Sequence, residues 1–94
     1  MKLDKNGYAP SIMPELWGGE TEYTCRHEIY YGEKDREISK RNGFWVAMPP
    51  AVHHTLHHNP GHGVDSLLKV MCQKKFEETH TREEFKKLIG RSYL

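Results

Sequence analysis

Five histidines fall within ten residues near the middle of this chain, between two segments that break regular structure. They lie in the sequence His53-His54-Thr55-Leu56-His57-His58 and at His62. Pro49-Pro50 ends any preceding strand, because proline has no N–H group to donate to a sheet, and Pro50 suits the first turn of a helix. Asn59-Pro60-Gly61 then ends that helix. The segment therefore predicts a short helix whose surface is dominated by imidazole rings.

Histidines four residues apart lie on the same side of a helix, so His53/His57 and His54/His58 each present two rings together. Imidazole nitrogens bind divalent transition metals at about 2.0–2.1 Å. Four rings on so short a helix cannot all converge, so at most one such pair, or His54 with His57, faces a metal. The alternative is a solvated histidine cluster with no role as ligands.

Two segments that favour strands precede the histidines and predict a small sheet. Residues 24–31 are rich in β-branched and aromatic side chains, which favour strands. Residues 44–48, Phe-Trp-Val-Ala-Met, form a second such run. The charged connection over residues 32–43 ends at Asn42-Gly43, a strong turn signal. We therefore predict that the two strands form an antiparallel hairpin.

The two ends of the chain complete the expected order. Residues 1–23 contain prolines and glycines and predict an irregular arm, which Ile12, Met13, Leu16 and Trp17 attach to the core. Asp65 is the expected N-cap of a helix over roughly 66–79, with an apolar stripe of Leu68, Met71, Cys72 and Phe76. Thr81-Arg82-Glu83-Glu84 is a capping box for a last helix, which buries Phe85, Leu88 and Ile89 and ends at Gly90.

Composition limits the class of protein further. Ninety-four residues, 36% of them hydrophobic, suffice for one thin core, so residues 24–94 are expected to form a single α+β domain. The formal net charge of +1 excludes a strongly basic nucleic-acid binder. Two cysteines, Cys25 and Cys72, make no disulfide framework, which favours the cytoplasm. No apolar run approaches the ~18 residues of a membrane span, and the first residues lack the apolar region of a signal peptide.

His27 lies in the middle of the first predicted strand, between Arg26 and Glu28. An unperturbed imidazole has a pKa of about 6.5, which suits a general base near neutral pH. A rigid strand can direct this ring towards a metal held by the histidine helix. The alternative is a half-buried histidine bonded to a backbone carbonyl.

Four basic residues in the connection between the strands are candidate contacts to DNA phosphates: Lys34, Arg36, Lys40 and Arg41. Acidic residues alternate with them at Glu33, Asp35 and Glu37. A solvated loop with no nucleic-acid role therefore fits the same pattern.

Three blocks of the sequence resemble small phage and prophage nucleases of the HNH type. The blocks are Arg26-His27-Glu28-Ile29-Tyr30-Tyr31-Gly32; Gly43-Phe44-Trp45-Val46-Ala47-Met48 with Pro50, His53 and His54; and the end of the chain from Phe76 to Leu94. The similarity covers about residues 12–94. The Cys-x-x-Cys of these nucleases is replaced by Leu16-Trp17-Gly18-Gly19, and their Cys-Pro by Pro49-Pro50. Packing by Trp17 and its neighbours is therefore expected in place of a zinc knuckle.

The resemblance implies a ββα-metal fold, in which a hairpin and a helix hold one divalent ion: zinc, magnesium, manganese or nickel. It implies a cytoplasmic endonuclease of the bacterial host cell that hydrolyses DNA, with His27 as the catalytic base. The metal ligands that it implies are His54 and either His57 or His58, with His62 as a candidate further ligand. The alternative function is an inactive HNH-like module that binds nucleic acid or a phage or host protein. A third is a zinc-stabilised, histidine-rich domain without an active site.

Overall fold

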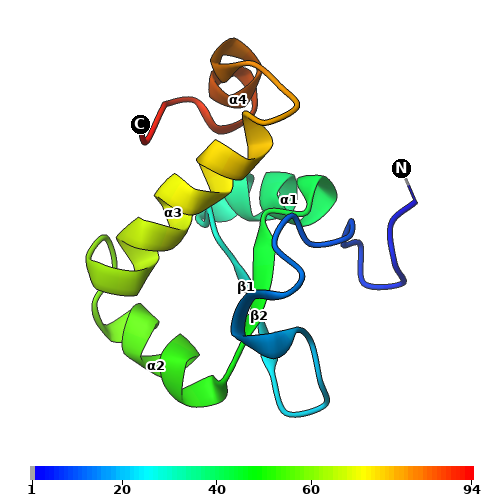
Figure 1. Cartoon of the computed structure of the whole chain (residues 1–94), viewed down its shortest axis with the longest axis vertical. Helices are drawn as coiled ribbons and strands as arrows, with labels where there is room; N and C mark the ends of the chain where they lie inside the picture. The colour runs from blue at the N-terminus through cyan, green and yellow to red at the C-terminus, as the bar shows by residue number, and fades with distance from the viewer. Residues whose placement is uncertain (1) are drawn as a thin grey trace.

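The computed structural model describes residues 2–94 as an α+β arrangement of four α-helices and a two-stranded sheet (Figure 1). The strands pair antiparallel, as predicted, with His27 opposite Val46. None of the helices in this part of the chain is long and apolar enough to cross a membrane. In chain order the elements are the 3-10 turn η1 (Leu16–Gly18), β1 (Cys25–Glu28), α1 (Glu33–Asn42), β2 (Trp45–Met48), α2 (Pro50–His58), α3 (Gly63–Phe76) and α4 (Arg82–Ile89).

The connection between the strands is helix α1, so the prediction of a charged loop with a hairpin turn was wrong. Acidic side chains lie in the first turn of α1 and basic ones in the last, the arrangement that the helix dipole favours. Gly43 has a φ of 75° and its N–H caps the helix by donating to the carbonyl oxygens of Lys40 and Ser39. Asn42-Gly43 is therefore the end of a helix, because the left-handed conformation that suits a tight turn also suits a C-cap.

Strand β1 is shorter than the predicted range of residues 24–31. After Glu28, the buried Ser39 of α1 takes the place of a neighbouring strand. Its hydroxyl donates to the carbonyl oxygen of Tyr30 at 2.6 Å and accepts from the Tyr30 N–H at 3.2 Å. A side chain thus satisfies the backbone groups that a longer ladder would have paired.

The core lies between the sheet and helices α2, α3 and α4. It is built from aromatic and aliphatic side chains of all these elements, among them Ile29, Tyr30, Phe44, Val46, Leu56, Leu68, Phe76 and Phe85. The N-terminal arm is attached to this core by Ile12, Met13 and Leu16, as predicted. Trp17 is the exception: it is 39% exposed, at a positive φ of 54°, and so is not the packing residue that we expected.

The last two helices follow the predicted order with one correction. The capping box at Thr81 and Glu84 is present at the start of α4, and Gly90 ends that helix in the left-handed conformation. Asp65, however, is not the N-cap of α3, since that helix begins at Gly63 after His62. The Asp65 side chain turns inwards and is fully buried, because it serves tertiary contacts described below.

Candidate metal centre

Three histidines converge from strand β1 and helix α2. The ligand nitrogens of His27, His53 and His57 all lie within 4.8 Å of one another. The Nε2 atoms of His53 and His57, one turn apart on α2, are 2.9 Å apart. The His27 ring lies edge-on to both, at interplanar angles of 65° and 81° and centroid separations of 5.3 Å and 5.5 Å. This is a three-nitrogen donor set of the kind that transition metals bind.

The environment of His27 keeps its imidazole neutral. The residue is only 2% exposed, and its Nε2 is buried without a hydrogen-bond partner among residues 2–94. Burial, together with repulsion from His53 and His57, lowers the pKa of His27 to about 4. Burial also lowers the pKa of His53, with repulsion from His57 adding to it. Neutral imidazoles are the form that binds a metal, and the buried Nε2 of His27 has no protein hydrogen-bond partner among residues 2–94.

These rings line a cavity of about 210 Å³, whose other walls are polar. Arg36 of α1 reaches the cavity, with its Nε 3.5 Å from the carboxylate of Glu28 and its side chain 59% exposed. Tyr31 forms part of the wall, with its ring centroid 6.0 Å from that of His27. The site is therefore a polar recess with one accessible guanidinium at its rim.

Arg26 also lines the cavity but is held by the N-terminal arm. Its guanidinium donates to the carboxylates of Asp4 and Glu20 and lies over the rings of Tyr8 and Trp45, 4.6 Å and 4.5 Å from their centroids. These contacts neutralise its charge locally. Arg26 is therefore a structural link between the arm and β1, and Arg36 is the cation left to meet an anion.

A buried carboxylate supports the wall behind the histidines. Asp65 of α3 accepts a hydrogen bond from the Tyr31 hydroxyl at 2.7 Å and one from the Gly61 N–H at 2.5 Å, with the Lys69 ammonium at 3.3 Å. Although burial raises the pKa of Asp65, these hydrogen bonds and the Lys69 charge outweigh it, and the pKa lies below its usual value. The carboxylate thus connects α3, the α2–α3 turn and the residue that lines the cavity.

The structure brings together only some of the predicted site residues. His27 and His57 belong to the three-nitrogen group, and His53 takes the place expected for His54. His54 and His58 lie beside each other on another side of α2, with ring centroids 4.3 Å apart. His62 is exposed and precedes α3. The spacing of the histidines left His53 and His57 open as the pair that faces a metal, but the ligand set taken from the resemblance omitted His53.

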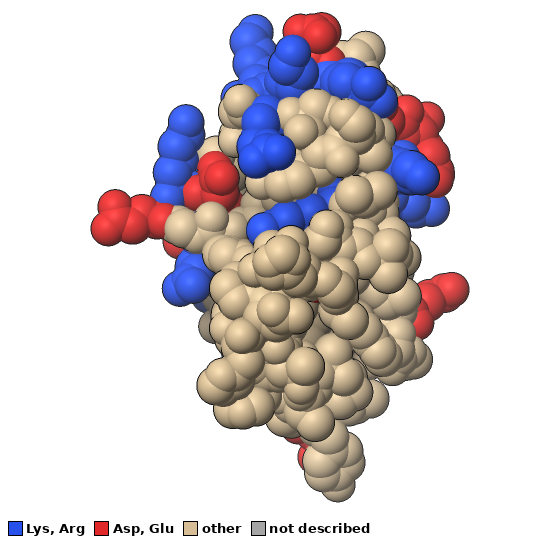
Figure 2. Space-filling view, turned by 90° about the vertical axis from the view of Figure 1, so that its left-hand side faces the viewer, with Lys and Arg blue, Asp and Glu red and all other residues tan. Residues whose placement is uncertain are grey.

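The four candidate DNA contacts lie on helix α1 rather than on a loop. Of these, only Arg36 lines the histidine cavity. Lys40 forms an ion pair with Glu37 and lies over the Tyr8 ring, while Lys34 and Arg41 are exposed. Elsewhere, basic side chains gather over α4 and the end of α3, whereas the surface over α2 and the start of α3 is uncharged (Figure 2).

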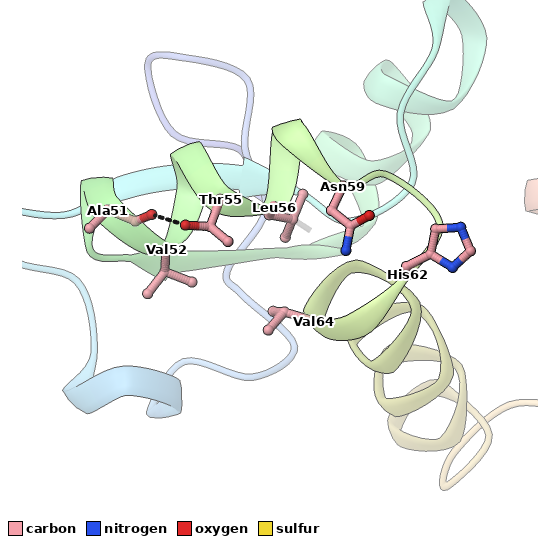
Figure 3. Close-up of a pocket in the computed structure, with 7 residues that line it drawn as sticks. All are labelled: Ala51, Val52, Thr55, Leu56, Asn59, His62 and Val64. Carbon is pink, nitrogen blue, oxygen red and sulfur yellow. Dashed lines mark hydrogen bonds between the residues drawn. The ribbon is translucent and has the colours of Figure 1, made fainter.

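A second cavity, of about 290 Å³, lies on another side of α2 and is largely apolar. Figure 3 shows Val52 of α2 and Val64 of α3 facing each other across it, while the His62 ring turns away. Val64 and Leu67 at the start of α3 are 39% and 56% exposed. This apolar cavity is distinct from the histidine recess in both position and chemistry.

Comparison with known proteins gives no relative for this arrangement: no family model, no curated protein and no solved structure matches the chain.

Proposed function

We propose that the chain is a metal-dependent endonuclease of the HNH type that hydrolyses phosphodiester bonds of DNA. The observation that carries the proposal is the convergence of His27 from β1 with His53 and His57 from the helix that follows β2. Two antiparallel strands followed by a metal-binding helix is the arrangement that the resemblance to HNH nucleases implies. The exposed guanidinium of Arg36 at the rim of the same cavity supports a negatively charged substrate.

The donor set favours one class of metal. Three imidazoles suit zinc, nickel and other borderline transition metals, whereas magnesium prefers oxygen ligands. No carboxylate oxygen joins the three-nitrogen group in residues 2–94. Among the four ions that the resemblance implies, zinc and nickel therefore fit these residues best.

We assign His27 to metal binding rather than to general base catalysis. A base with a pKa of about 4 is mostly deprotonated at neutral pH but holds a proton weakly, so it is a poor proton acceptor there. The same neutral ring has an unpartnered nitrogen and offers one of three ligand nitrogens that lie within 4.8 Å of one another, so it is well suited as a ligand. This replaces the catalytic role that the resemblance gives to His27.

The other protein groups around the site bind the substrate or keep the wall of the recess in place. When bound, the ion supplies Lewis-acid stabilisation of negative charge on the phosphate. Arg36 binds a non-bridging phosphate oxygen and orients the backbone of the DNA, at the cost of its contact with Glu28. Tyr31, fixed by Asp65, keeps the wall of the recess in place beside His27 and His57.

The test is a nicking assay on supercoiled plasmid, with the metal content of the same sample measured by elemental analysis. We expect cleavage with nickel, zinc or manganese and none after chelation. Folded protein that contains metal but leaves plasmid and single-stranded DNA intact would show that the chain is not a nuclease.

The apolar cavity between α2 and α3 favours a second candidate function. An inactive HNH-like module that binds a phage or host protein would need a surface of this kind, with Val64 and Leu67 exposed beside uncharged residues. A metal-loaded protein without nuclease activity would favour this function. Loss of partner binding in Leu67→Ser, with metal affinity unchanged, would then support it.

A further inference from the structure

Helix α2 carries a second pair of histidines that the proposed nuclease site does not use. His54 and His58 are exposed, and their ring centroids lie 4.3 Å apart. Successive residues of a helix are rotated by about 100°. His54 and His58 are therefore rotated away from His53 and His57, and they do not join the three-nitrogen group in the described residues.

We propose that His54 and His58 form a second transition-metal site, separate from the His27, His53 and His57 group. Imidazoles four residues apart on one helix lie close enough to bind the same ion through one nitrogen each. Their ring centroids are already 4.3 Å apart, and both side chains are exposed and so can rotate to direct a nitrogen at one ion. The ligand class is a borderline divalent ion, such as zinc, nickel or copper, because the donors are nitrogens alone.

The surroundings of the pair suit a metal held by few protein ligands. No Asp, Glu, Lys or Arg occurs between Asn42 and Val64, and the surface over α2 is uncharged (Figure 2). No ammonium or guanidinium on the helix itself therefore repels the ion, and no carboxylate completes its shell. With two protein ligands, a four-coordinate ion keeps two positions for water or for donors of another molecule. The site is open and binds more weakly than the three-histidine group.

The experiment isolates the new site by removing the first one. Zinc binding to the His53→Gln/His57→Gln variant is measured by isothermal titration calorimetry, and the histidine ring signals are followed by NMR. We expect one ion per chain, with shifts confined to the rings of His54 and His58. Adding His54→Gln and His58→Gln to this variant should abolish the binding. Circular dichroism of both variants checks that the helices are retained.

The stoichiometry of the wild-type chain gives a second readout. We expect two ions per chain, falling to one in the His54→Gln/His58→Gln variant. If the three-histidine group holds no metal and the proposed function fails, the wild-type chain still binds one ion at His54 and His58. If folded His53→Gln/His57→Gln protein binds no zinc, the second site does not exist, whatever the result for the nuclease.

Discussion

The Nε2 atoms of His53 and His57 lie 2.9 Å apart across one turn of α2, close enough for a hydrogen bond. Such a bond needs one Nε2 atom with a proton and one without, so the two Nε2 atoms do not both carry a proton in this geometry. A bound metal satisfies both nitrogens at once and removes this conflict. The pair is therefore arranged either to share a proton or to share a metal.

Zinc affinity and cleavage rate together distinguish a metal-ligand role of His27 from a general-base role. If His27 is a ligand, as proposed, we expect His27→Ala in a His54→Gln/His58→Gln background to weaken zinc binding by more than the ~10–100-fold that loss of an outer partner costs. His57→Ala should have the same effect, and His62→Ala, outside the group, none. The measurement is a competition titration with a chromogenic chelator. Unchanged zinc affinity in His27→Ala, with cleavage reduced by roughly 10²–10⁴-fold, would instead identify a base.

Burial of His27 makes the stability of the metal-free protein depend on pH. The ordinary pKa of 6.5 applies in the unfolded chain, and the pKa in the folded protein is about 4. Between these two pH values the unfolded chain binds a proton at His27 that the folded protein does not bind. The free energy of unfolding is therefore unaffected by protonation of His27 above pH 6.5 and decreases as the pH falls towards 4. The loss is roughly 3 kcal/mol. Urea unfolding between about pH 7 and pH 4 measures it, and His27→Gln should flatten the dependence. An equal slope in that variant would exclude His27 as the source.

The hydrogen bond between Tyr31 and Asp65 should stabilise the fold. Tyr31→Phe removes the hydroxyl that donates to a fully buried carboxylate and should lower the free energy of unfolding by about 1–3 kcal/mol. Tyr23→Phe is the matched control, because Tyr23 is 78% exposed, and it should change little. Denaturant unfolding at neutral pH compares the two. Equal stabilities for both variants would mean that Asp65 finds another donor.

Two helix-capping glycines should differ in their tolerance of alanine. Gly43 and Gly90 both end helices at positive φ, so alanine is strained at each by roughly 1–2 kcal/mol. At Gly43 an added Cβ would also overlap the carbonyl oxygen of Pro10, whereas at Gly90 it meets open space. Gly43→Ala should therefore lower the melting temperature more and release the arm to limited proteolysis. Equal shifts in melting temperature would contradict the close approach of Pro10.

Arg36 should contribute more to DNA binding than Arg41 on the same helix. Arg36 lines the histidine cavity, and Arg41 is exposed elsewhere on α1. If Arg36 neutralises one phosphate, Arg36→Gln lowers the slope of log affinity against log salt by about one unit. Fluorescence anisotropy with duplex DNA over a salt series measures this slope. A larger change in Arg41→Gln would place the DNA on another face of α1.

Local sequence signals were sufficient to predict several of the helices and strands. The prolines and the Asn-Pro-Gly break determine the bounds of α2, and the Thr81–Glu84 capping box determines the start of α4. The strand-favouring residues 24–31 and the apolar run of β2 predicted the two strands, although β1 ends at Glu28, where Ser39 replaces a neighbouring strand. Their antiparallel pairing was predicted from a hairpin turn that is in fact the end of helix α1. Helix α1 was missed because its ten residues carry Ile38 as the only large apolar side chain, and its buried contact is a serine.

The sequence by itself determined that imidazoles would cover α2, and that His27 would lie on a neighbouring strand. Only the tertiary structure decided which imidazoles face His27. The buried side chain of Leu56 fixes the rotation of α2 about its axis, and that rotation turns the rings of His53 and His57 towards His27 while His54 and His58 face away from it. Both pairs have the same spacing, so the pattern along the chain cannot distinguish them. Packing against the core distinguishes them, because it is the burial of one apolar side chain that selects the direction in which each ring points.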